Sequence, residues 1–523
     1  MQDFSVQTVL LLVLSVCVLI AIRITIQFRT AVANIQNHPG YRVLLNPASV
    51  LGSISPEIRG IALGRSNQIR NKHGHFSRAG WDIISAVSVY PKVQTEFFLA
   101  DAAAIKEVTS SRYRFPKPVH QYSLLLFFGA NIVASEGEEW KRFRKIAASA
   151  FSDRNNRLVW DETSLIMFDM FNNTWGGQKE IVVDHCVDIT LQVSLSRPKL
   201  LGTIKIYFPG VGFGRKISWR DDQAIPIGHR MTFKEALHIV STDMILRLIV
   251  PEWAMGLTTR LRNVRVAFEE LEKYMSDLIQ DRKTKEKTEL RYDLFSSLLD
   301  ANDDQGLSEG EAKLSTRELF GNIFIFQLAG HETTAHTLCF AFALLALYPD
   351  EQDALFLHIK QLLPDDRLPT YDEMPLFTYS IAVFYETLRM FPPAPIVPKI
   401  SSQDTILKSG NAAGEMTLIP IPKGAVVNMH IAGLHFNSRY WEDPHTFKPS
   451  RFLKDWPRDA FMPFSAGARA CLGRKFFETE GIVILTMMIS RYKIEVKDEP
   501  QFAAETFEEK KARILATKSG LTL

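Results

Sequence analysis

The sequence predicts a mainly α-helical protein with a small β-rich portion, preceded by one membrane-spanning helix. Three observations support this prediction: an apolar segment near the N-terminus, a strand-like stretch at residues 83–93, and long helical patterns after it. Of the 523 residues, 46% are hydrophobic and 23% are charged, so the chain can bury a large core. We see no internal repeat and no long stretch that is poor in apolar residues, and therefore expect one large domain.

Charge and cysteine content exclude several classes of protein. Lys and Arg number 61 against 58 Asp and Glu, so the formal net charge of +3 is too small to make nucleic acid the main partner. The four cysteines form no CxxC pair, which argues against a zinc site and against a disulfide framework. We therefore expect the catalytic part to lie in a reducing compartment.

The first expected element is a membrane helix from Val6 to Ile26. At about 1.5 Å per residue this segment spans about 30 Å, the thickness of a hydrocarbon core. A cleaved signal peptide is the alternative, but no basic residue precedes the segment. Arg23 and Arg29 lie at its far end, so the positive-inside tendency places the rest of the chain in the cytosol.

The domain boundaries follow from this helix. We expect a membrane anchor at residues 1–28, a linker at 29–45 and a single catalytic domain at 46–523. The catalytic domain begins with the strand-like stretch and continues as a mostly helical body.

Three helices are expected in that body. The first covers residues 138–151. The second opens at Ser315, which forms an S-x-x-E capping box with Glu318, and its apolar run reaches about residue 347. The third covers residues 379–390 and ends before two prolines, because proline supplies no amide and blocks the preceding turn.

Residues 331–336 nearly spell the zinc-protease motif H-E-x-x-H. The second histidine, His336, comes one residue late. A spacing of five leaves two side chains about 140° apart around a helix, whereas a spacing of four leaves them about 40° apart. His331 and His336 therefore cannot share a metal.

Residues 464–473 form a glycine-bearing loop that presents Cys471 at the start of a helix. Unpaired backbone N–H groups there, together with Arg469 and Arg474, favour an anion. We expect Cys471 to be a thiolate, and thus a metal ligand or a nucleophile. A buried, inert cysteine is the alternative, but it does not explain the flanking glycines and arginines. A thiol protease would need a partner histidine that the sequence does not indicate.

Two further pairs lie at helical spacing. Glu386 and Arg389 are three residues apart on one face of an apolar helix, where burial would make the loss of either partner costly. Taken alone, this pair indicates a structural role. Trp140 and Arg144 are four residues apart and project an indole N–H and a guanidinium in the same direction. Both are donors suited to a carboxylate.

Together and in this order, the motifs resemble those of the cytochrome P450 family, the haem-thiolate monooxygenases. The family's cysteine-loop pattern F-x-x-G-x-R-x-C-x-G is matched at every fixed position, and the resemblance covers residues 39–523. It implies that Cys471 is the axial ligand of the iron of haem b. It also implies that Glu386, Arg389 and Arg451 form a buried structural triad.

The resemblance assigns the remaining motifs as well. Residues 329–334 match the oxygen-binding groove A-G-x-[DE]-[ST]-[ST] of the family, which implies that Glu332 and Thr333 are the catalytic pair that relays protons. The small residues Ala329 and Gly330 let the backbone approach the cofactor. The implied cofactor-binding residues are Trp140, Arg144, Lys399, Arg469, Gly330 and Phe464.

Two features depart from the family pattern. Residues 197–210 look like extra sequence between two helices, and the chain ends at residues 520–523, where relatives usually continue into a last strand. Either feature could leave the fold incomplete while the haem motifs stay intact.

The resemblance implies an NADPH- and O2-dependent enzyme that hydroxylates or epoxidises an apolar small molecule, such as a terpenoid or another secondary metabolite. NADPH–cytochrome reductase is the expected electron donor. The expected location is the endoplasmic reticulum membrane, with one span and a cytosolic catalytic domain, as in fungal members. Two alternatives stay open: a reductase-independent isomerase or dehydratase, and a non-catalytic haem-binding membrane protein.

Two surfaces are expected around the site. Apolar residues should line the substrate pocket, namely Phe115, Leu124–Phe128, Phe324, Phe326 and Pro393–Val397. A local basic patch should receive an acidic electron donor and consists of Lys141, Arg142, Lys145, Arg474 and Lys475.

Overall fold

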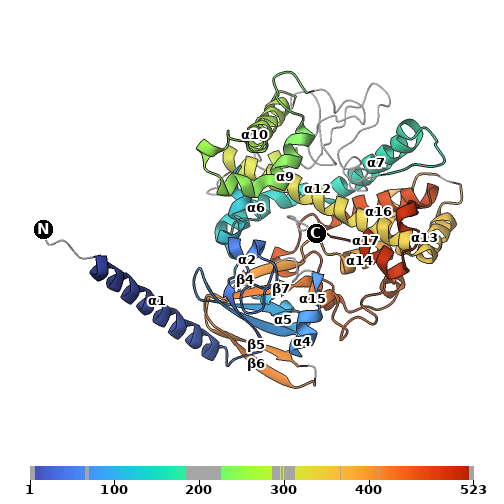
Figure 1. Ribbon diagram of the computed structural model, residues 1–523. Coiled ribbons are helices and arrows are strands. Elements are labelled where there is room, and N and C mark those ends of the chain that lie inside the picture. The colour runs from blue at the N-terminus through green and yellow to red at the C-terminus, as the bar shows by residue number, and fades with distance from the viewer. Residues whose placement is uncertain are drawn as a thin grey trace. The chain divides into compact units, whose positions relative to one another are not determined.

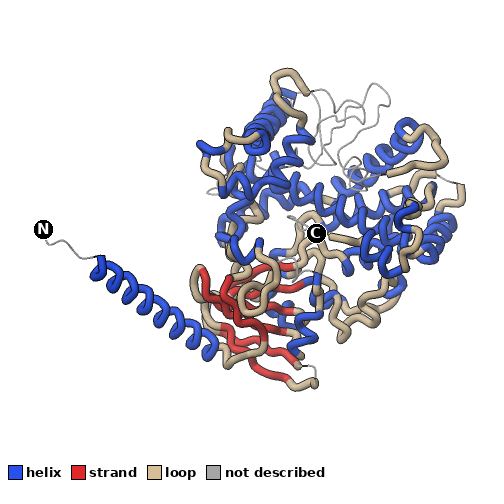
Figure 2. Tube along the Cα trace, viewed as in Figure 1, coloured by secondary structure: helices blue, strands red, loops and turns tan. Residues whose placement is uncertain are grey.

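The computed structural model describes residues 6–64, 70–183, 225–285, 295, 298–299, 313–365, 367–411 and 413–517. The chain divides into two compact units. The β-rich unit comprises residues 1–118, 394–446 and 457–470, and the helical unit comprises residues 119–393, 447–456 and 471–523. All described strands belong to the β-rich unit, and helices dominate elsewhere (Figures 1 and 2). The expected extra segment at 197–210, the chain end at 520–523 and Cys186 lie outside the described residues.

Helix α1 (Val6–Asn34) contains the expected membrane segment. An 18-residue window of its stretch Leu10–Asn34 has a mean hydropathy of 2.5 and contains no buried residue, so this stretch is long and apolar enough to cross a membrane. The helix runs past the expected anchor boundary, and strand β1 (Gly40–Leu45) follows. The stretch expected as a linker, residues 29–45, is therefore occupied by the end of α1 and by β1.

The β-rich unit is built on a five-stranded sheet in the order β1-β2-β3-β7-β4. Strands β1 and β2 pair in parallel, as do β3 and β7, and the other pairs are antiparallel. The strands after β1 are β2 (Ile83–Tyr90), β3 (Gln94–Leu99), β4 (Ile396–Ile400) and β7 (Val426–His430), and a separate hairpin contains β5 (Thr405–Gly410) and β6 (Met416–Ile421). The strand expected at residues 83–93 is confirmed for residues 83–90, which form β2, and the first six of them are buried because both faces of the strand are covered.

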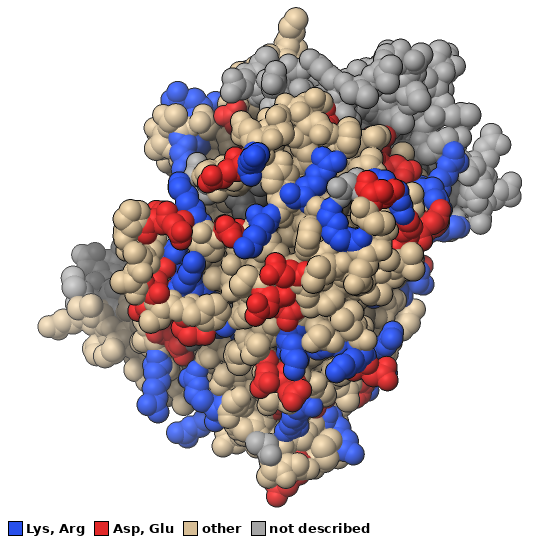
Figure 3. All heavy atoms as spheres, turned by 90° about the vertical axis from the view of Figure 1, so that its right-hand side faces the viewer, with Lys and Arg blue, Asp and Glu red and all other residues tan. Residues whose placement is uncertain are grey.

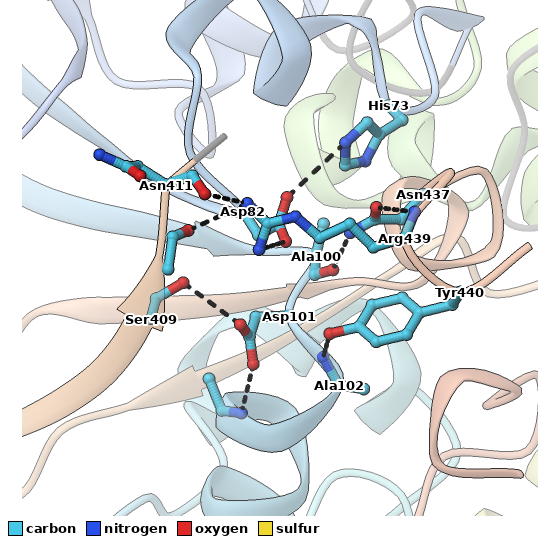
Figure 4. A network of polar contacts seen from close by, with 12 residues as sticks. His73, Asp82, Ala100, Asp101, Ala102, Ser409, Asn411, Asn437, Arg439 and Tyr440 are labelled. Carbon is cyan, nitrogen blue, oxygen red and sulfur yellow. Dashed lines mark hydrogen bonds and ion pairs between the residues drawn. The ribbon is translucent and has the colours of Figure 1, made fainter. Parts of the chain in front are cut away.

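Short helices accompany this sheet, namely α2 (Val50–Ile54), α4 (Gly74–Ala79), α5 (Ala102–Ser110) and α15 (Ile431–His435). A buried polar network fixes the start of α5 (Figure 4). Asp101 caps the helix by accepting a hydrogen bond of 2.9 Å from the backbone N–H of Ala104, and the Ser409 hydroxyl lies 3.3 Å from its other oxygen. Asp82, 4% exposed, pairs with the Arg439 guanidinium at 3.0 Å. The network thus ties α5 to strand β5.

The helical unit contains a large apolar core. Its helices are α6 (Gly137–Ala148), α7 (Asp153–Asp169), α9 (Phe233–Ile249), α10 (Thr259–Lys285), α12 (Thr316–Leu347), α13 (Pro349–Leu362), α14 (Thr378–Met390), α16 (Arg474–Arg491) and α17 (Phe507–Ile514). The three helices expected in the body are confirmed as α6, α12 and α14. The capping box of α12 is also present: the Ser315 hydroxyl accepts from the N–H of Glu318, and the Glu318 carboxylate accepts from the N–H of Ser315 at 2.8 Å.

Candidate active site

Helix α12 has an open turn in the middle of its length, at Ala329 and Gly330, where space beside the helix is not filled by protein atoms. Ala329 and Gly330 are exposed, although the flanking Leu328 and Ala335 are 5% and 0% exposed. A Cβ atom built on Gly330 would meet no heavy atom within 4 Å. A flat group can therefore approach the helix backbone at this turn.

The same turn carries hydroxyl groups that bond back to the helix. The Thr333 hydroxyl donates to the carbonyl of Ala329 at 2.7 Å, and the Thr334 hydroxyl donates to the carbonyl of Gly330 at 3.0 Å. Such bonds to residue i−4 compete with the regular helix bonds and often bend a helix. The Thr333 oxygen keeps its acceptor capacity, and Glu332 lies half-buried beside it.

Cys471 lies just before helix α16 and not on its first turn. The helix begins at Arg474 with Gly473 as its N-cap residue. The Cys471 side chain is exposed, and the backbone N–H of Gly473 hydrogen-bonds to it. The loop therefore leaves Cys471 exposed just before the helix.

The surroundings of Cys471 raise the pKa of its thiol, whereas the sequence led us to expect a thiolate. Burial raises the pKa of its thiol, because protein atoms fill most of the surroundings of the thiol even though the residue as a whole is exposed. The Gly473 N–H and the charges of Arg474 and Arg144 act in the opposite direction, and Glu478 raises the pKa further. The expected positive groups are present, but desolvation outweighs them.

Phe151 connects the cysteine loop to the open turn of α12 within the helical unit. A Cβ atom on Gly473 would lie 3.3 Å from the Phe151 ring, so the loop packs closely on that ring. The Phe151 and Phe326 rings make an edge contact with centroids 5.7 Å apart. Phe326 precedes Gly330 by four residues and so shares its helix face. The loop of Cys471 and the exposed face of α12 are therefore neighbours.

The predicted donors on α6 lie in contact with each other. The Trp140 side chain is 4% exposed, and the Arg144 guanidinium carbon lies 5.7 Å from the centroid of its indole ring. The charge of Arg144 also acts on the thiol of Cys471. The helical unit thus brings together the α6 pair, the cysteine and the open turn of α12.

The other predicted cofactor residues are held by the β-rich unit. Lys399, 5% exposed, lies in β4, and Arg469 ends the short 3-10 turn Gly467–Arg469 after a half-buried Phe464. Gly467 has a φ of +66°, and a Cβ atom there would lie 2.3 Å from the carbonyl oxygen of Thr109 in α5. Only glycine fits, so the first half of the cysteine loop is fixed against α5.

The structure brings the three residues of the expected triad together. The Glu386 carboxylate accepts hydrogen bonds from Arg389 Nε at 2.7 Å and from Arg451 Nε at 3.0 Å. It also accepts from the backbone N–H of Lys448 at 3.0 Å. Glu386 and Arg389 are completely buried. This cluster pins the segment of η7 (Pro449–Leu453) to helix α14.

The basic patch expected for an electron donor is weaker than the sequence predicts. Arg142 pairs with Glu318, and Arg474 Nε lies 2.8 Å from Glu478 Oε1. Basic and acidic side chains are also interspersed on the face shown in Figure 3. The Arg474–Glu478 pair could be found from its i, i+4 spacing, whereas the partners Arg142 and Glu318 are separated by 176 residues.

Three aromatic residues expected in the substrate pocket lie in the packed interior instead. Phe115, Phe128 and Phe324 are at most 1% exposed, so their inclusion in the pocket lining is wrong. The Phe128 ring packs against Phe324 at 4.7 Å and against Phe268 at 5.6 Å between centroids. Phe268, which the sequence did not indicate, completes this part of the core.

Comparisons with known proteins agree with this arrangement. The sequence model described as Cytochrome P450 matches residues 83–520. The chain is 50% identical over 519 residues to Cytochrome P450 monooxygenase 124 of Postia placenta, covering 99% of this chain and 97% of that protein. It is 28% identical over 438 residues to Cytochrome P450 monooxygenase ORF6 of Penicillium roqueforti, covering 76% and 73% of the two chains.

A solved structure confirms the predicted fold class. The crystal structure of cytochrome P450DA heme domain superposes with a TM-score of 0.66 at 22% identity, covering 82% of this chain and 87% of that chain. From the sequence match, the shared fold and the common motifs, the chain belongs to the cytochrome P450 family and is a monooxygenase of that family, whose cofactor is haem with a thiolate ligand.

Proposed function

We propose that this enzyme binds haem b through Cys471 and inserts one oxygen atom from O2 into an apolar small molecule by hydroxylation or epoxidation, using electrons from NADPH. The observation that carries the proposal is the juxtaposition, through Phe151, of the Cys471 loop and the open turn of α12 at Gly330. This turn bears Glu332 and Thr333.

The residues present fit this cofactor. The open space at Gly330 lets a flat group approach the helix, and Cys471 on the neighbouring loop supplies the thiolate ligand, because a thiol that coordinates a metal ion loses its proton to solvent. Thiolate-bound haem supplies the activation of O2, because thiolate donation favours cleavage of the O–O bond. Trp140 and Arg144, both on α6, offer N–H donors for the propionate groups of haem, which are carboxylates. The family resemblance supports the same role for Lys399 and Arg469 and a packing role for Phe464, all three of which lie in the β-rich unit.

Proton delivery is assigned to Thr333 and Glu332. The Thr333 hydroxyl donates a hydrogen bond to the Ala329 carbonyl, so its oxygen can accept a hydrogen bond from a water molecule or another donor. If the Thr333 O–H bond rotated away from the Ala329 carbonyl, the hydroxyl could instead donate a hydrogen bond into the space beside Gly330. Glu332 can supply the proton, because a half-buried carboxyl group can exchange with water and then transfer within the site.

Replacing Thr333 by alanine should divert electrons from product to hydrogen peroxide. The hydroxyl that orients the proton donor is lost, while the residues that hold the cofactor are unchanged. The ratio of product formed to NADPH consumed should fall, and peroxide should rise in proportion. Measurement of NADPH, product and peroxide in the same reaction checks this.

The chain offers two controls for this variant. Thr333→Ser keeps the hydroxyl and should behave like the parent enzyme. Thr337→Ala removes an equivalent hydroxyl, which donates to the Thr333 carbonyl at 2.8 Å one turn further along α12, and should leave the product ratio unchanged. If Thr333→Ala also leaves that ratio unchanged, Thr333 does not direct protons to oxygen.

The substrate class, partner and location are further parts of the proposal. Partly exposed apolar residues of the helical core, including Leu124, Phe127 and Phe326, support an apolar substrate, for which we propose a terpenoid or another secondary metabolite. NADPH–cytochrome reductase is the proposed donor, with the family membership as support. The apolar α1 supports a single-pass anchor, which we assign to the endoplasmic reticulum membrane with a cytosolic catalytic domain.

The reaction type is tested with the purified full-length chain, the reductase, NADPH and isotopically labelled O2. Candidate compounds are first screened for displacement of the iron-bound water in the haem spectrum, and those that bind are then offered as substrates. One labelled oxygen atom per product, formed only with NADPH, supports the proposal. Turnover without NADPH would instead identify an isomerase or dehydratase, and haem binding with no turnover of any bound compound would identify a non-catalytic haem protein.

A further inference from the structure

The segment that leads into helix α9 is held by one face of helix α10. Glu270, Tyr274 and Asp277 are spaced four and three residues apart on α10, so they line a single face of this helix. The His229 ring lies flat on the Tyr274 ring, with centroids 3.7 Å apart and an angle of 4° between the planes. The His229 side chain is 3% exposed, although its neighbours at residues 225–228 are exposed. This face of α10 therefore encloses the imidazole ring.

A carboxylate lies at each end of the ring. His229 Nδ1 lies 2.8 Å from Glu270 Oε2, and His229 Nε2 lies 3.1 Å from Asp277 Oδ2. A neutral imidazole has one N–H group and can donate to only one of these oxygens, whereas the protonated ring donates to both. An arrangement in which both hydrogen bonds are made is therefore that of imidazolium.

The other charged groups described around the ring belong to the same segment and to α10. Arg230 Nε donates to Glu270 Oε1 at 3.0 Å, its guanidinium also pairs with Glu269, and Lys273 donates to a backbone carbonyl of the segment. Burial acts to raise the pKa of Glu270, but hydrogen bonds from Arg230 and His229 hold it below its usual value. Glu270 is therefore ionised at neutral pH, and its buried charge is compensated by donors from the segment.

The attachment of this segment determines how α9 begins. The Tyr274 hydroxyl donates to the carbonyl of Met231 at 2.9 Å, and the Tyr274 ring makes an edge contact with Phe233, the first residue of α9. The buried face of α9 belongs to the apolar core of the helical unit and packs against η1 (Val119–Leu126), which carries part of the apolar surface proposed for the substrate. Release of His229 would therefore loosen α9 beside that surface.

We propose that His229 in its protonated form is a positioning residue that holds the start of α9 on α10, and that loss of this proton loosens α9 and speeds the entry of substrate. The neutral ring keeps one N–H group, which stays with Glu270 because this carboxylate is 3% exposed. Asp277 is 51% exposed, so it turns to water when Nε2 no longer donates to it. The effect on the substrate rests on the proposed function, whereas the attachment of α9 does not.

Hydrogen exchange of the full-length protein tests the attachment. Backbone amides at the start of α9 are followed by mass spectrometry at about pH 6 and about pH 8.5, on either side of the range in which histidine side chains titrate, with correction for the intrinsic pH dependence of exchange. Protection in the parent should be about tenfold lower at the higher pH, the effect of losing one hydrogen bond between charged groups. Equal protection at the two pH values would overturn the inference.

Substitutions separate the proton from the packing. His229→Gln cannot donate to both carboxylates, so protection should be low at both pH values. His229→Arg keeps a planar and permanently charged group that can stack on Tyr274 and donate to both carboxylates, so protection should stay high at both. Asp277→Asn should also remove the pH dependence, because an amide can donate to the neutral ring nitrogen or accept from the protonated one. A pH dependence that persists in His229→Arg would overturn the role of the His229 proton.

His238 provides a matched control, because it is an exposed histidine of α9 itself. His238→Gln removes a titratable ring from the same helix and should keep the pH dependence of the parent. Loss of the pH dependence in this variant would assign the effect to His238 and overturn the inference.

The effect on the substrate is measured separately, with a compound that displaces the iron-bound water in the haem spectrum. After rapid mixing, the parent should bind this compound faster at the higher pH, whereas His229→Arg should bind it slowly at both. Equal binding rates of the parent at the two pH values would overturn the link between α9 and substrate entry. A protein that binds no haem through Cys471 would overturn the proposed function, and the exchange measurement would still decide the attachment of α9.

Discussion

Replacement of Cys471 by serine should abolish the thiolate-type spectrum of the reduced carbon monoxide adduct. Cys471 is exposed, receives the Gly473 N–H and lies on the loop beside the open turn of α12. A serine oxygen is a harder donor and stays protonated at neutral pH, so it cannot replace the thiolate. The expected effect is complete loss of this spectrum, together with loss of NADPH-dependent product formation.

Cys339→Ser is the control for this experiment. Cys339 lies half-buried in α12, the same helix that carries the open turn. Its replacement should leave the spectrum intact. If Cys471→Ser retained the thiolate-type spectrum and Cys339→Ser lost it, the assignment of the ligand would be wrong.

Replacement of Glu386 by glutamine should destabilise the helical unit by about 3–5 kcal/mol, the usual cost of removing one partner from a buried ion pair. The amide keeps the shape of the carboxylate but leaves Arg389, which is completely buried, without a counter-charge. It also weakens the contacts to Arg451 and to the backbone N–H of Lys448. Denaturant titration, followed by circular dichroism, should show a lower unfolding midpoint.

A surface ion pair of similar geometry provides the comparison. Arg157 donates two hydrogen bonds to Asp372 at 2.6 and 2.9 Å, but both side chains are largely exposed. Solvent screens this pair, so Asp372→Asn should shift the midpoint far less than Glu386→Gln does. If the unfolding midpoint fell equally in both variants, the buried Glu386 cluster would stabilise the fold no more than the exposed pair does.

Local spacing in the sequence was enough to predict several parts of this protein. The capping box at Ser315 and Glu318, the contact of Trp140 with Arg144 and the pair Glu386–Arg389 are each set within one or two turns of a helix. The helix repeat fixes such neighbours wherever the helix is placed in the fold. The apolar α1 was predictable for the same reason, because its length and composition are properties of one segment.

Contacts between distant segments could not be predicted in this way. The ion pair of Arg142 with Glu318 joins two helices whose approach depends on the whole helical core. The packing of Phe128 against both Phe324 and Phe268 also required the packed structure, because an apolar residue in a sequence can face either a pocket or the core.

The sequence by itself determined the family, the helical fold class and the positions of the motifs, because these depend on residue identity and local spacing. Only the tertiary structure decided the environment of Cys471. The sequence indicated the positive groups around it, but the burial that raises the pKa of its thiol comes from segments packed around the loop. Desolvation sums over all surrounding atoms, whereas a motif records only the residues next to one another in the chain.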